Sequence, residues 1–543
     1  YGDHRDLHLS LRRQRQMCIR DSVITVDRIW NPENGEWIDA VRFTFQRFAD
    51  HAIAEQLLNL LGDHPSDDDL RAAFGVNGII DPPSLSPSVV EALAIQLPER
   101  FGKELADYVD QKDEYLRYLV RQAMLHSLIW RNPRAFPPVE WLEAYINEEL
   151  GGLTDEVLDV LLTVCARPEH PLNADILHGN LTRLSMAHRD ALWILYLHRN
   201  FGNPGSSIRR ILDWGEKADF RKVEERCVEL FATAVCWLFT SSNRELRDRA
   251  TKVLARVFYQ RLDCAKPVLE RFRDVDDLYV KERLYAAVYG ACLWHNGEQR
   301  KLIADLAQWF YEREFKEGAP VLHLLARDYA RGVIEVAARA SALPDGLELG
   351  KVRPPYRSPW QLEDAPPFPG WDQFENGSGL WAIAASLREQ WGDFARYVVE
   401  PMVNKFVLNP EKDERVDIGH VLRWLYARIL QLGYRDELFA EHDVIECRYF
   451  DRMDHHHERI GKKYQWIAFN ELLARFSDNC LLLLEWGSSE ATPYRGPWQI
   501  WMRDIDPSCW LEGEAEAHAS QHPWWVPFLE SLPKRNWEEY VEW

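Results

Sequence analysis

The sequence predicts an all-α protein, an irregular α-solenoid of HEAT-like or TPR-like helical hairpins. Between Asn243 and Leu343, apolar residues recur at intervals of three and four, which gives several successive helices one apolar stripe each. Helix, short turn and helix also alternate at a spacing of roughly 35–40 residues per pair, the layout of helical-repeat arrays. The pairs are not close copies of one another, so we expect an irregular array.

The best-patterned region, 241–343, is expected to hold five helices. Ser242 and Glu245 have the spacing of a capping box, in which a hydroxyl and a carboxylate satisfy the exposed backbone donors of a helix start. Pro267 suits the first turn of the second helix, where its missing N–H has no partner to lose. The fifth helix is expected over 321–343. The stripe of the first helix comprises Leu246, Ala250, Val253, Leu254, Val257, Phe258 and Leu262.

Upstream, residues 23–240 form an N-terminal helical region with the same texture. Downstream, seven prolines interleaved with aromatic residues make 344–371 an extended connector, because proline removes the donors that a helix needs. A second helical region, 372–484, follows, and 485–543 is expected to be an irregular, Trp-rich, truncated subdomain. Helices are expected at 51–61, 88–109, 113–131, 138–150, 154–166, 187–201, 221–240, 378–408, 415–433 and 462–478.

The two ends suggest a fragment of a longer protein. Residues 1–22, with Arg12-Arg13-Gln14-Arg15 and Met17-Cys18 at their centre, look like translated adapter sequence or a disordered arm. They have no apolar core and are therefore not a secretion signal. The alternative is a basic N-terminal arm. The last residues, 536–543, end without an obvious closing element.

Composition narrows the function classes. With 46% hydrophobic and 28% charged residues, the chain of 543 residues can bury a large core. A net charge of −21 argues against nucleic acid as a direct partner, because that binding needs a basic surface. Nine cysteines without a Cys-x-x-Cys pair predict a reducing cytoplasm, and no apolar run has the length of a membrane span.

Catalytic signatures are missing from the sequence. Gly461-Lys462-Lys463 lacks the earlier glycine and the following hydroxyl residue of a phosphate-binding loop, so we expect no ATPase activity and no cofactor in this chain. Asp454-His455-His456-His457-Glu458 invites a metal interpretation, but three consecutive histidines cannot face one ion from regular structure. A solvated turn is the preferred interpretation there. We therefore predict no catalytic, cofactor-binding or metal residue.

A glycan-active (α/α) toroid is the enzyme alternative, because 23 tryptophans could stack sugars and paired carboxylates could supply acid and base. Against it, many tryptophans fall on apolar helical stripes, where they are more often part of the core. These are Trp193, Trp237, Trp309, Trp391 and Trp466.

The most distinctive local string is 459–466, which places cations and aromatic rings at the start of a helix. Arginine and tryptophan are typical anchors of protein interfaces. The candidate partner-binding residues are Arg459, Lys462, Lys463, Tyr464 and Trp466. The alternative interpretation is that Tyr464 and Trp466 pack inward while the two lysines are solvated.

This string and several others resemble the C-terminal regions of large bacterial antiviral STAND NTPases of the AVAST type. The resemblance covers roughly residues 240–510 and consists of short strings in a fixed order. The strings are Ser241 to Lys252, Arg353-Pro354-Pro355-Tyr356, Gly392 to Tyr397, Glu437-Leu438-Phe439, Glu458 to Trp466 with Glu471 to Arg475, and Arg503 to Pro507.

The resemblance implies a helical sensor that binds a phage protein, followed by oligomerisation and activation of an N-terminal effector. ATP and magnesium would belong to an upstream nucleotide-binding module that this chain lacks. We therefore expect the ligand-sensing and scaffold region of such a protein, with a phage structural or packaging protein as partner. The alternative from the residues alone is a general helical scaffold unrelated to defence.

Overall fold

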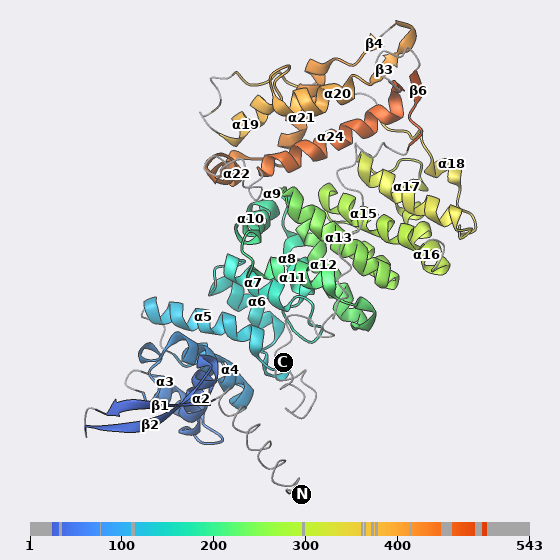
Figure 1. The fold of residues 1–543 in the computed structure, drawn as a ribbon. Coiled ribbons are helices and arrows are strands. Elements are labelled where there is room, and N and C mark those ends of the chain that lie inside the picture. The colour runs from blue at the N-terminus through green and yellow to red at the C-terminus, as the bar shows by residue number, and fades with distance from the viewer. Residues whose placement is uncertain are drawn as a thin grey trace, which may run out of the picture. The chain divides into compact units, whose positions relative to one another are not determined.

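The described part of the chain is predominantly helical, as predicted, and contains few strands (Figure 1). The chain forms two compact units, Tyr1–Val160 and Leu161–Trp543. No helix in the described part of the chain is both long and apolar enough to cross a bilayer. The computed structural model describes residues 24–31, 35–75, 78–109, 114–295, 299–359, 362, 365–370, 374, 378–412, 414–446, 459–483 and 491–496.

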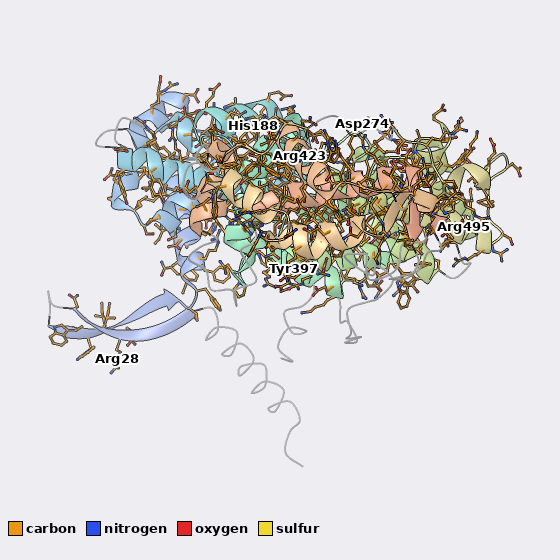
Figure 2. All side chains as sticks on the ribbon, turned by 90° about the horizontal axis from the view of Figure 1, so that it is seen from above. Arg28, His188, Asp274, Tyr397, Arg423 and Arg495 are labelled. Carbon is orange, nitrogen blue, oxygen red and sulfur yellow. The ribbon has the colours of Figure 1, made fainter. Side chains whose placement is uncertain are left out.

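The first unit opens with an antiparallel hairpin that the all-α prediction missed. Strands β1 (Ile24–Asn31) and β2 (Glu36–Phe43) pair with Trp30 opposite Trp37, and these two rings meet edge to face at 5.7 Å. Arg28 projects into solvent, where it pairs with Asp39 at 3.2 Å (Figure 2). Gly35, at φ +66°, adopts the left-handed backbone that the connection requires.

The other regular elements among the described residues of the first unit are helices, and they enclose its core. Their starts follow local capping rules: Ser66 and Asp69 form a reciprocal capping box on α3, and Ser86 caps α4 with Pro87 in its first turn. α4 ends at Gly102, whose φ is +66°. The core packs Leu58, Leu93 and Val120, among others. The helices are α2 (Gln46–Asn59), α3 (Asp67–Phe74), α4 (Pro87–Phe101), α5 (Glu114–Trp130) and α6 (Val139–Glu148).

The second unit begins, after α7 (Asp155–Val164) at the division, with a run of short helices. A single π-helical turn, η4, interrupts what the sequence predicted as one helix over 187–201. The elements are α8 (Ala174–Arg183), α9 (Met186–Arg189), η4 (Asp190–Ile194), α10 (Leu195–Phe201) and α11 (Ser207–Lys217).

Six helices of the second unit then pack as two rows of three. α13, α15 and α17 contact one another in chain order, and so do α12, α14 and α16, while α12 contacts α13 and α16 contacts α17. The predicted helices of 241–343 all form. Together the six make up the helical array: α12 (Glu225–Leu238), α13 (Arg244–Gln260), α14 (Ala265–Arg271), α15 (Leu278–Trp294), α16 (Arg300–Phe310) and α17 (Leu324–Arg339).

The start of α13 differs in detail from the predicted capping box. Asn243 is the capping residue, and its side chain accepts a hydrogen bond from Leu246 N at 3.1 Å. Ser242 lies one residue too early and instead faces the ring of His198 at 3.4 Å. Asparagine caps at least as well as serine, because its carbonyl oxygen reaches the same exposed N–H groups.

α11 and α13 approach closely at a glycine. A Cβ at Gly215 would lie 2.5 Å from Val253 Cγ1 and 2.9 Å from Phe231 Cζ. We therefore expect Gly215→Ala to lower the free energy of unfolding by about 1–3 kcal/mol, because the added methyl overpacks this contact. Urea denaturation measures it. The matched control is Gly179→Ala on α8, which meets nothing within 4 Å and is expected to be neutral or stabilising by up to about 1 kcal/mol. Equal effects of the two substitutions would contradict this packing.

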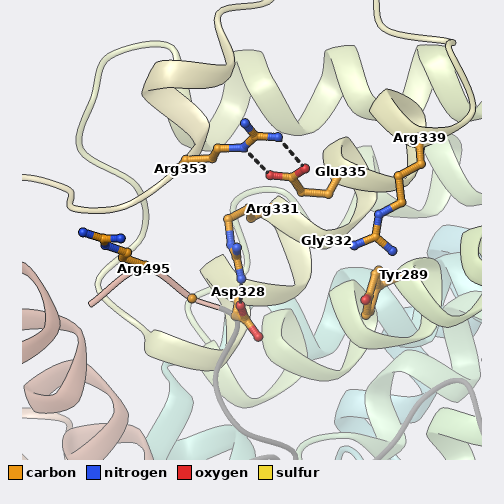
Figure 3. A pocket seen from close by; sticks show the side chains of 9 residues that line it. Tyr289, Asp328, Arg331, Gly332, Glu335, Arg339, Arg353 and Arg495 are labelled. Atoms are coloured by element: carbon orange, nitrogen blue, oxygen red, sulfur yellow. Dashed lines mark hydrogen bonds and ion pairs between the residues drawn. The ribbon is translucent and has the colours of Figure 1, made fainter. Parts of the chain in front are cut away.

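The connector 344–371 has one short helix, α18 (Leu349–Val352), among its described residues. It contacts the array through Tyr356, whose ring is buried and lies under the guanidinium of Arg327 at 4.9 Å. Arg353 also pairs with Glu335 of α17 at 2.7 Å (Figure 3). Tyr356 therefore packs the connector against the helical array. Trp360 and Trp371 lie outside the described residues.

The last part of the second unit centres on α24 (Ile460–Asn479), which is buried along most of its length and contacts α15, α17 and α21. A helix that is buried on nearly every side belongs to the interior of its unit. The core around it includes Ile383, Leu425, Phe439 and Leu472. The accompanying helices are α19 (Gly379–Ser386), α20 (Glu400–Val403), α21 (Ile418–Gln431) and α22 (Asp436–Ala440), followed by the π-turn η11 (Glu441–Glu446).

The helix predicted over 378–408 is wrong in extent. α19 ends at Ser386, and the chain turns at Gln390 and Gly392 before a π-turn, η9 (Ala395–Val399), and α20. A Cβ at Gly392 would lie 2.2 Å from the carbonyl oxygen of Ser386, so only glycine fits this turn. The chain then enters a small antiparallel sheet that was not predicted, with strand order β4-β3-β5-β6. Its strands are β3 (Phe406–Asn409), β4 (Glu414–Arg415), β5 (Leu481–Leu483) and β6 (Ala491–Pro493).

Candidate functional site

The predicted partner-binding string lies at the start of α24. Some of its residues are buried and others are partly exposed. Lys463 and Tyr464 are fully buried, so neither side chain is on the surface. Arg459, Lys462 and Trp466 are half-buried, and Trp466 packs its ring against Phe394 at 5.3 Å. Tyr464 therefore packs inward, as the alternative interpretation of the string held. Lys463 is not solvated as that alternative assumed.

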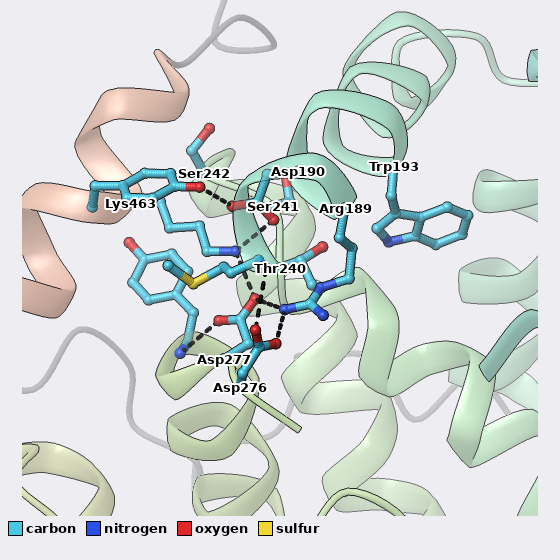
Figure 4. Close-up of polar contacts among 12 residues, drawn as sticks. Arg189, Asp190, Trp193, Thr240, Ser241, Ser242, Asp276, Asp277 and Lys463 are labelled. Carbon is cyan, nitrogen blue, oxygen red and sulfur yellow. Dashed lines mark hydrogen bonds and ion pairs between the residues drawn. The ribbon is translucent and has the colours of Figure 1, made fainter. Parts of the chain in front are cut away.

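Lys463 is the centre of a buried ionic network, here called the junction cluster: Arg189, Asp190, Asp276, Asp277 and Lys463. Lys463 Nζ lies 2.8 Å from Asp190 Oδ1 and 2.7 Å from Asp277 Oδ2, and all three side chains are inaccessible to solvent (Figure 4). Arg189 Nη2 lies 2.7 Å from Asp276 Oδ1 and 3.6 Å from Asp277 Oδ2. Asp276 alone is half exposed. Two buried cations thus face two buried carboxylates.

Local structure places each member of the junction cluster. Asp190 opens the π-turn η4, directly after Arg189 at the end of α9. Asp277 caps α15, where its Oδ1 accepts a hydrogen bond from Tyr279 N at 3.0 Å and its other oxygen remains for the cations. The cluster therefore ties together three segments that lie far apart in the sequence: the α9–η4 turn, the start of α15 and the start of α24.

A further buried carboxylate, outside the junction cluster, fixes the first turn of α24. Asp443 accepts hydrogen bonds from Ile460 N at 2.7 Å and Gly461 N at 2.9 Å, two backbone donors that a helix start leaves without partners. Tyr434 donates its hydroxyl to the same carboxylate at 2.8 Å. This arrangement sets the direction in which Lys463 and Tyr464 enter the interior.

The electrostatics of the junction cluster follow from its burial. Desolvation raises the pKa of Asp190 to about 6, and the neighbouring Lys463, which favours the ionised carboxylate, opposes that shift. Burial also raises the pKa of Tyr464 well above its usual value, so its hydroxyl stays protonated and donates to Asp190 Oδ2 at 3.0 Å. Every cluster charge thus has an opposite partner.

Two histidines extend this polar region. His198 Nδ1 lies 3.0 Å from His442 Nε2, and His198 Nε2 lies 3.2 Å from the Ser241 hydroxyl. Arg247 stacks on the Tyr279 ring at 4.0 Å and donates to the Ser241 carbonyl oxygen at 3.3 Å. Two of the strings that carry the family resemblance, 241–252 and 458–466, therefore contribute to one buried junction (Figure 4).

The junction cluster is better suited to holding helices together than to binding a ligand or catalysing a reaction. The carboxylate oxygens of Asp190 and Asp277 already accept hydrogen bonds from protein donors, and the cluster opens on solvent only at Asp276. Among the described residues, no group of three or more His, Cys, Asp or Glu side chains could hold a metal ion. The histidines 455–457 lie outside the described residues.

The tryptophans predicted to be core residues differ in burial. Trp193 and Trp237 are fully buried, Trp309 is buried and donates its Nε1 to Glu270 at 2.7 Å, and Trp466 is half-buried. The prediction is wrong for Trp391, which is 78% exposed. Apolar residues three and four positions away suggested a helix, but the chain turns there, and this leaves the indole in solvent.

Sequence reasoning missed the acidic half of the junction cluster and the cap of α24. Asp277 carried a usable signal, because an aspartate directly before an apolar helical run is a candidate cap. Asp190 and Asp443 are single carboxylates in an acidic chain and carried none. Comparisons of the sequence with protein-family models, with curated proteins and with solved structures find no match.

Proposed function

We propose that this chain is the ligand-sensing and scaffold region of an antiviral STAND NTPase, and that it binds a phage structural or packaging protein through the surface of the helical array. The proposal treats the array as an irregular α-solenoid. Binding would shift the equilibrium between conformations of the whole protein rather than start a reaction in this chain. The family resemblance supports the setting, and the array supports the mode of recognition.

The observation that carries the proposal is the serial packing of α13, α15 and α17 on one side and α12, α14 and α16 on the other. Helices packed in succession form an extended surface of the kind that helical-repeat proteins use for binding. Neighbouring ends of α13 and α15 present an aromatic pair on this surface. Tyr259 and Trp294 are 39% and 44% exposed, and their rings meet edge to face at 6.1 Å.

Exposed tyrosine and tryptophan side by side are the residue types that dominate the energy of protein interfaces. Most other large apolar side chains of the array are buried, so this pair is the strongest anchor that its surface offers. The buried junction cluster does not contact a partner in this scheme. It holds the array against α24 through Lys463, which belongs to the resemblance string 458–466.

Co-expression with single phage proteins tests the proposal. The chain is co-expressed with the portal protein or with the large terminase subunit of a phage, and the complex is measured by co-elution on size exclusion. Tyr259→Ala combined with Trp294→Ala is expected to weaken a complex by roughly tenfold or more, since each truncated anchor costs about 1–2 kcal/mol. Trp391→Ala removes an even more exposed tryptophan away from the array and is expected to leave binding unchanged.

Thermal unfolding of each variant verifies that it folds. Association with neither protein, and with none of the other structural and packaging proteins tested singly, would contradict the proposed partner class. Equal loss of binding with Trp391→Ala would contradict the proposed surface. A Walker A motif in the sequence upstream of this chain in its gene is expected as well, and its absence would favour a general scaffold.

A further inference from the structure

The hairpin β1–β2 of the first unit exposes apolar side chains on both of its faces. Ile29 lies directly opposite Ile38, and Trp30 lies directly opposite Trp37. Because successive residues of a strand point to opposite faces, the isoleucine pair lies on one face of the hairpin and the tryptophan pair on the other. All four side chains are exposed, and Trp37 reaches 63%. An antiparallel hairpin on a protein surface usually buries its apolar face and solvates a polar one.

The exposed apolar surface continues from the hairpin onto the outer side of α2. The ring of Phe48 lies 6.5 Å from that of Phe43 at the end of β2 and 6.0 Å from that of Phe45, and both Phe45 and Phe48 are more than half exposed. Nearly half of the exposed large apolar side chains of the described residues belong to this one segment: Ile29, Trp30, Trp37, Ile38, Phe45, Phe48, Ile53 and Leu60. Exposed apolar surface concentrated in this way marks interaction sites on soluble proteins.

The backbone of the hairpin offers a second kind of contact. Among the described residues, β1 and β2 pair only with each other, and Figure 2 shows the hairpin extending away from the helices of its unit. Each outer edge therefore presents a row of main-chain N–H and C=O groups to a partner strand. A two-stranded hairpin is only marginally stable in water, and a third strand stabilises it. The backbone thus favours an extended segment that adds a strand to one edge.

Charge determines which kind of segment fits. Between residues 24 and 160, acidic residues outnumber basic ones by more than two to one, and this part of the sequence carries more than half of the net charge of −21. On the hairpin, Arg28 is paired with Asp39 at 3.2 Å. A second copy of this unit, an anionic membrane and a nucleic acid strand would all be repelled by its negative charge. A basic segment would be attracted.

We propose that the hairpin binds an extended segment of a partner protein in which apolar residues alternate with lysine or arginine. The segment pairs with one edge of the hairpin through main-chain hydrogen bonds. Its apolar side chains extend the face that carries Trp30 and Trp37, and its cations are attracted by the acidic unit. This interaction does not depend on the proposed recognition of a phage protein, because it uses residues of the other unit.

Fluorescence anisotropy with the full chain and labelled synthetic peptides tests the proposal. The probe is a basic peptide of about ten residues in which valine alternates with lysine, long enough to cover a strand of the hairpin. The first control peptide has glutamate in place of every lysine. The second control is the basic peptide methylated on its backbone nitrogens, which keeps every side chain and charge but removes the main-chain donors that strand pairing needs.

Substitutions locate the binding surface. Trp30→Thr combined with Trp37→Thr removes the tryptophan face, and threonine preserves the strands because it favours extended backbone. The matched control, Trp381→Thr with Trp391→Thr, removes two exposed tryptophans of the other unit. We expect the hairpin variant to raise the dissociation constant of the basic peptide roughly tenfold or more, because truncation of aromatic anchors dominates such losses. The control variant should change the dissociation constant less than twofold.

Hydrogen exchange of the unsubstituted chain gives a measurement that does not depend on how a variant folds. We expect the basic peptide to protect backbone amides within 24–43. Absence of binding or of this protection would overturn the proposal. Equal binding of the acidic or the methylated peptide, or unchanged affinity in the Trp30→Thr/Trp37→Thr protein, would overturn it as well.

Two further measurements distinguish other occupants of the same surface. The free chain is sedimented over a range of concentrations and is floated with phosphatidylcholine vesicles. We expect neither self-association through the hairpin nor binding to vesicles. A dimer that the Trp30→Thr/Trp37→Thr substitution dissociates would assign the surface to a second copy, and vesicle binding that the same substitution abolishes would assign it to a lipid surface. Either result would overturn the proposed partner.

Discussion

Replacing Lys463 with methionine is expected to lower the free energy of unfolding by about 3–5 kcal/mol, because the change leaves Asp190 buried without its nearest cation and Asp277 with only the 3.6 Å contact to Arg189. Methionine conserves the length and most of the volume of the lysine stem, so the loss reports the charge rather than a cavity. Lys463 Nζ contacts both carboxylates within 2.8 Å, and none of the three side chains touches solvent. Hydrogen exchange of α24 peptides, together with urea denaturation, measures the effect.

The adjacent Lys462 provides the matched control. Its side chain is half-buried, and Lys462→Met is expected to change stability by less than about 1 kcal/mol. Adding Asp190→Asn and Asp277→Asn to Lys463→Met should recover part of the loss, since the triple variant buries no unpaired charge. A Lys463→Met protein as stable as the Lys462→Met protein would show that the lysine is not confined in the interior.

The second large effect is expected at Arg327, which joins α17 to the end of α24. Its guanidinium donates to Asp478 at 3.0 Å and to the Ala474 carbonyl oxygen at 2.9 Å, and the Arg327 and Asp478 side chains are 2% and 1% exposed. Arg327→Met would leave the carboxylate of Asp478 and a helix carbonyl oxygen without this donor. The expected loss is again about 3–5 kcal/mol. Urea denaturation and loss of exchange protection at the end of α24 measure it.

The control for Arg327 is an exposed ion pair that also involves α17. Arg353 pairs with Glu335 of α17, but its side chain is 54% exposed, so Arg353→Met is expected to cost only about 0–1 kcal/mol. If Arg327→Met and Arg353→Met destabilise the protein equally, burial does not determine how much these ion pairs contribute to stability. That result would contradict the packing of α24 against the array described above.

Helices could be predicted from the sequence where the determining interactions are local. The predicted 113–131 is α5 (Glu114–Trp130), and the stripe beginning at Leu246 is the buried face of α13. The hairpin at 24–43 was missed although Asn34-Gly35, a favoured hairpin turn, lies between its strands. The β3–β5 pairing could not be found, because strands of three or four residues separated by more than 70 positions leave no periodic signal.

The difference between local and long-range interactions also explains which features of the candidate site could be predicted from the sequence. The sequence drew attention to Lys463 but not to its surroundings, because a lysine is rarely buried without a partner and the partner Asp190 lies 273 positions away. Trp391 was assigned to the core from its neighbours, yet one turn of the chain exposes it.

Hydrogen exchange of the chain with and without its co-eluting phage protein tests the central claim most directly, namely that the surface of the helical array is the functional part. We expect new protection on the peptides of α13 and α15 that carry Tyr259 and Trp294, with the junction cluster protected equally in both states. Protection confined to other parts of the chain, or no stable complex with any phage protein, would contradict the claim.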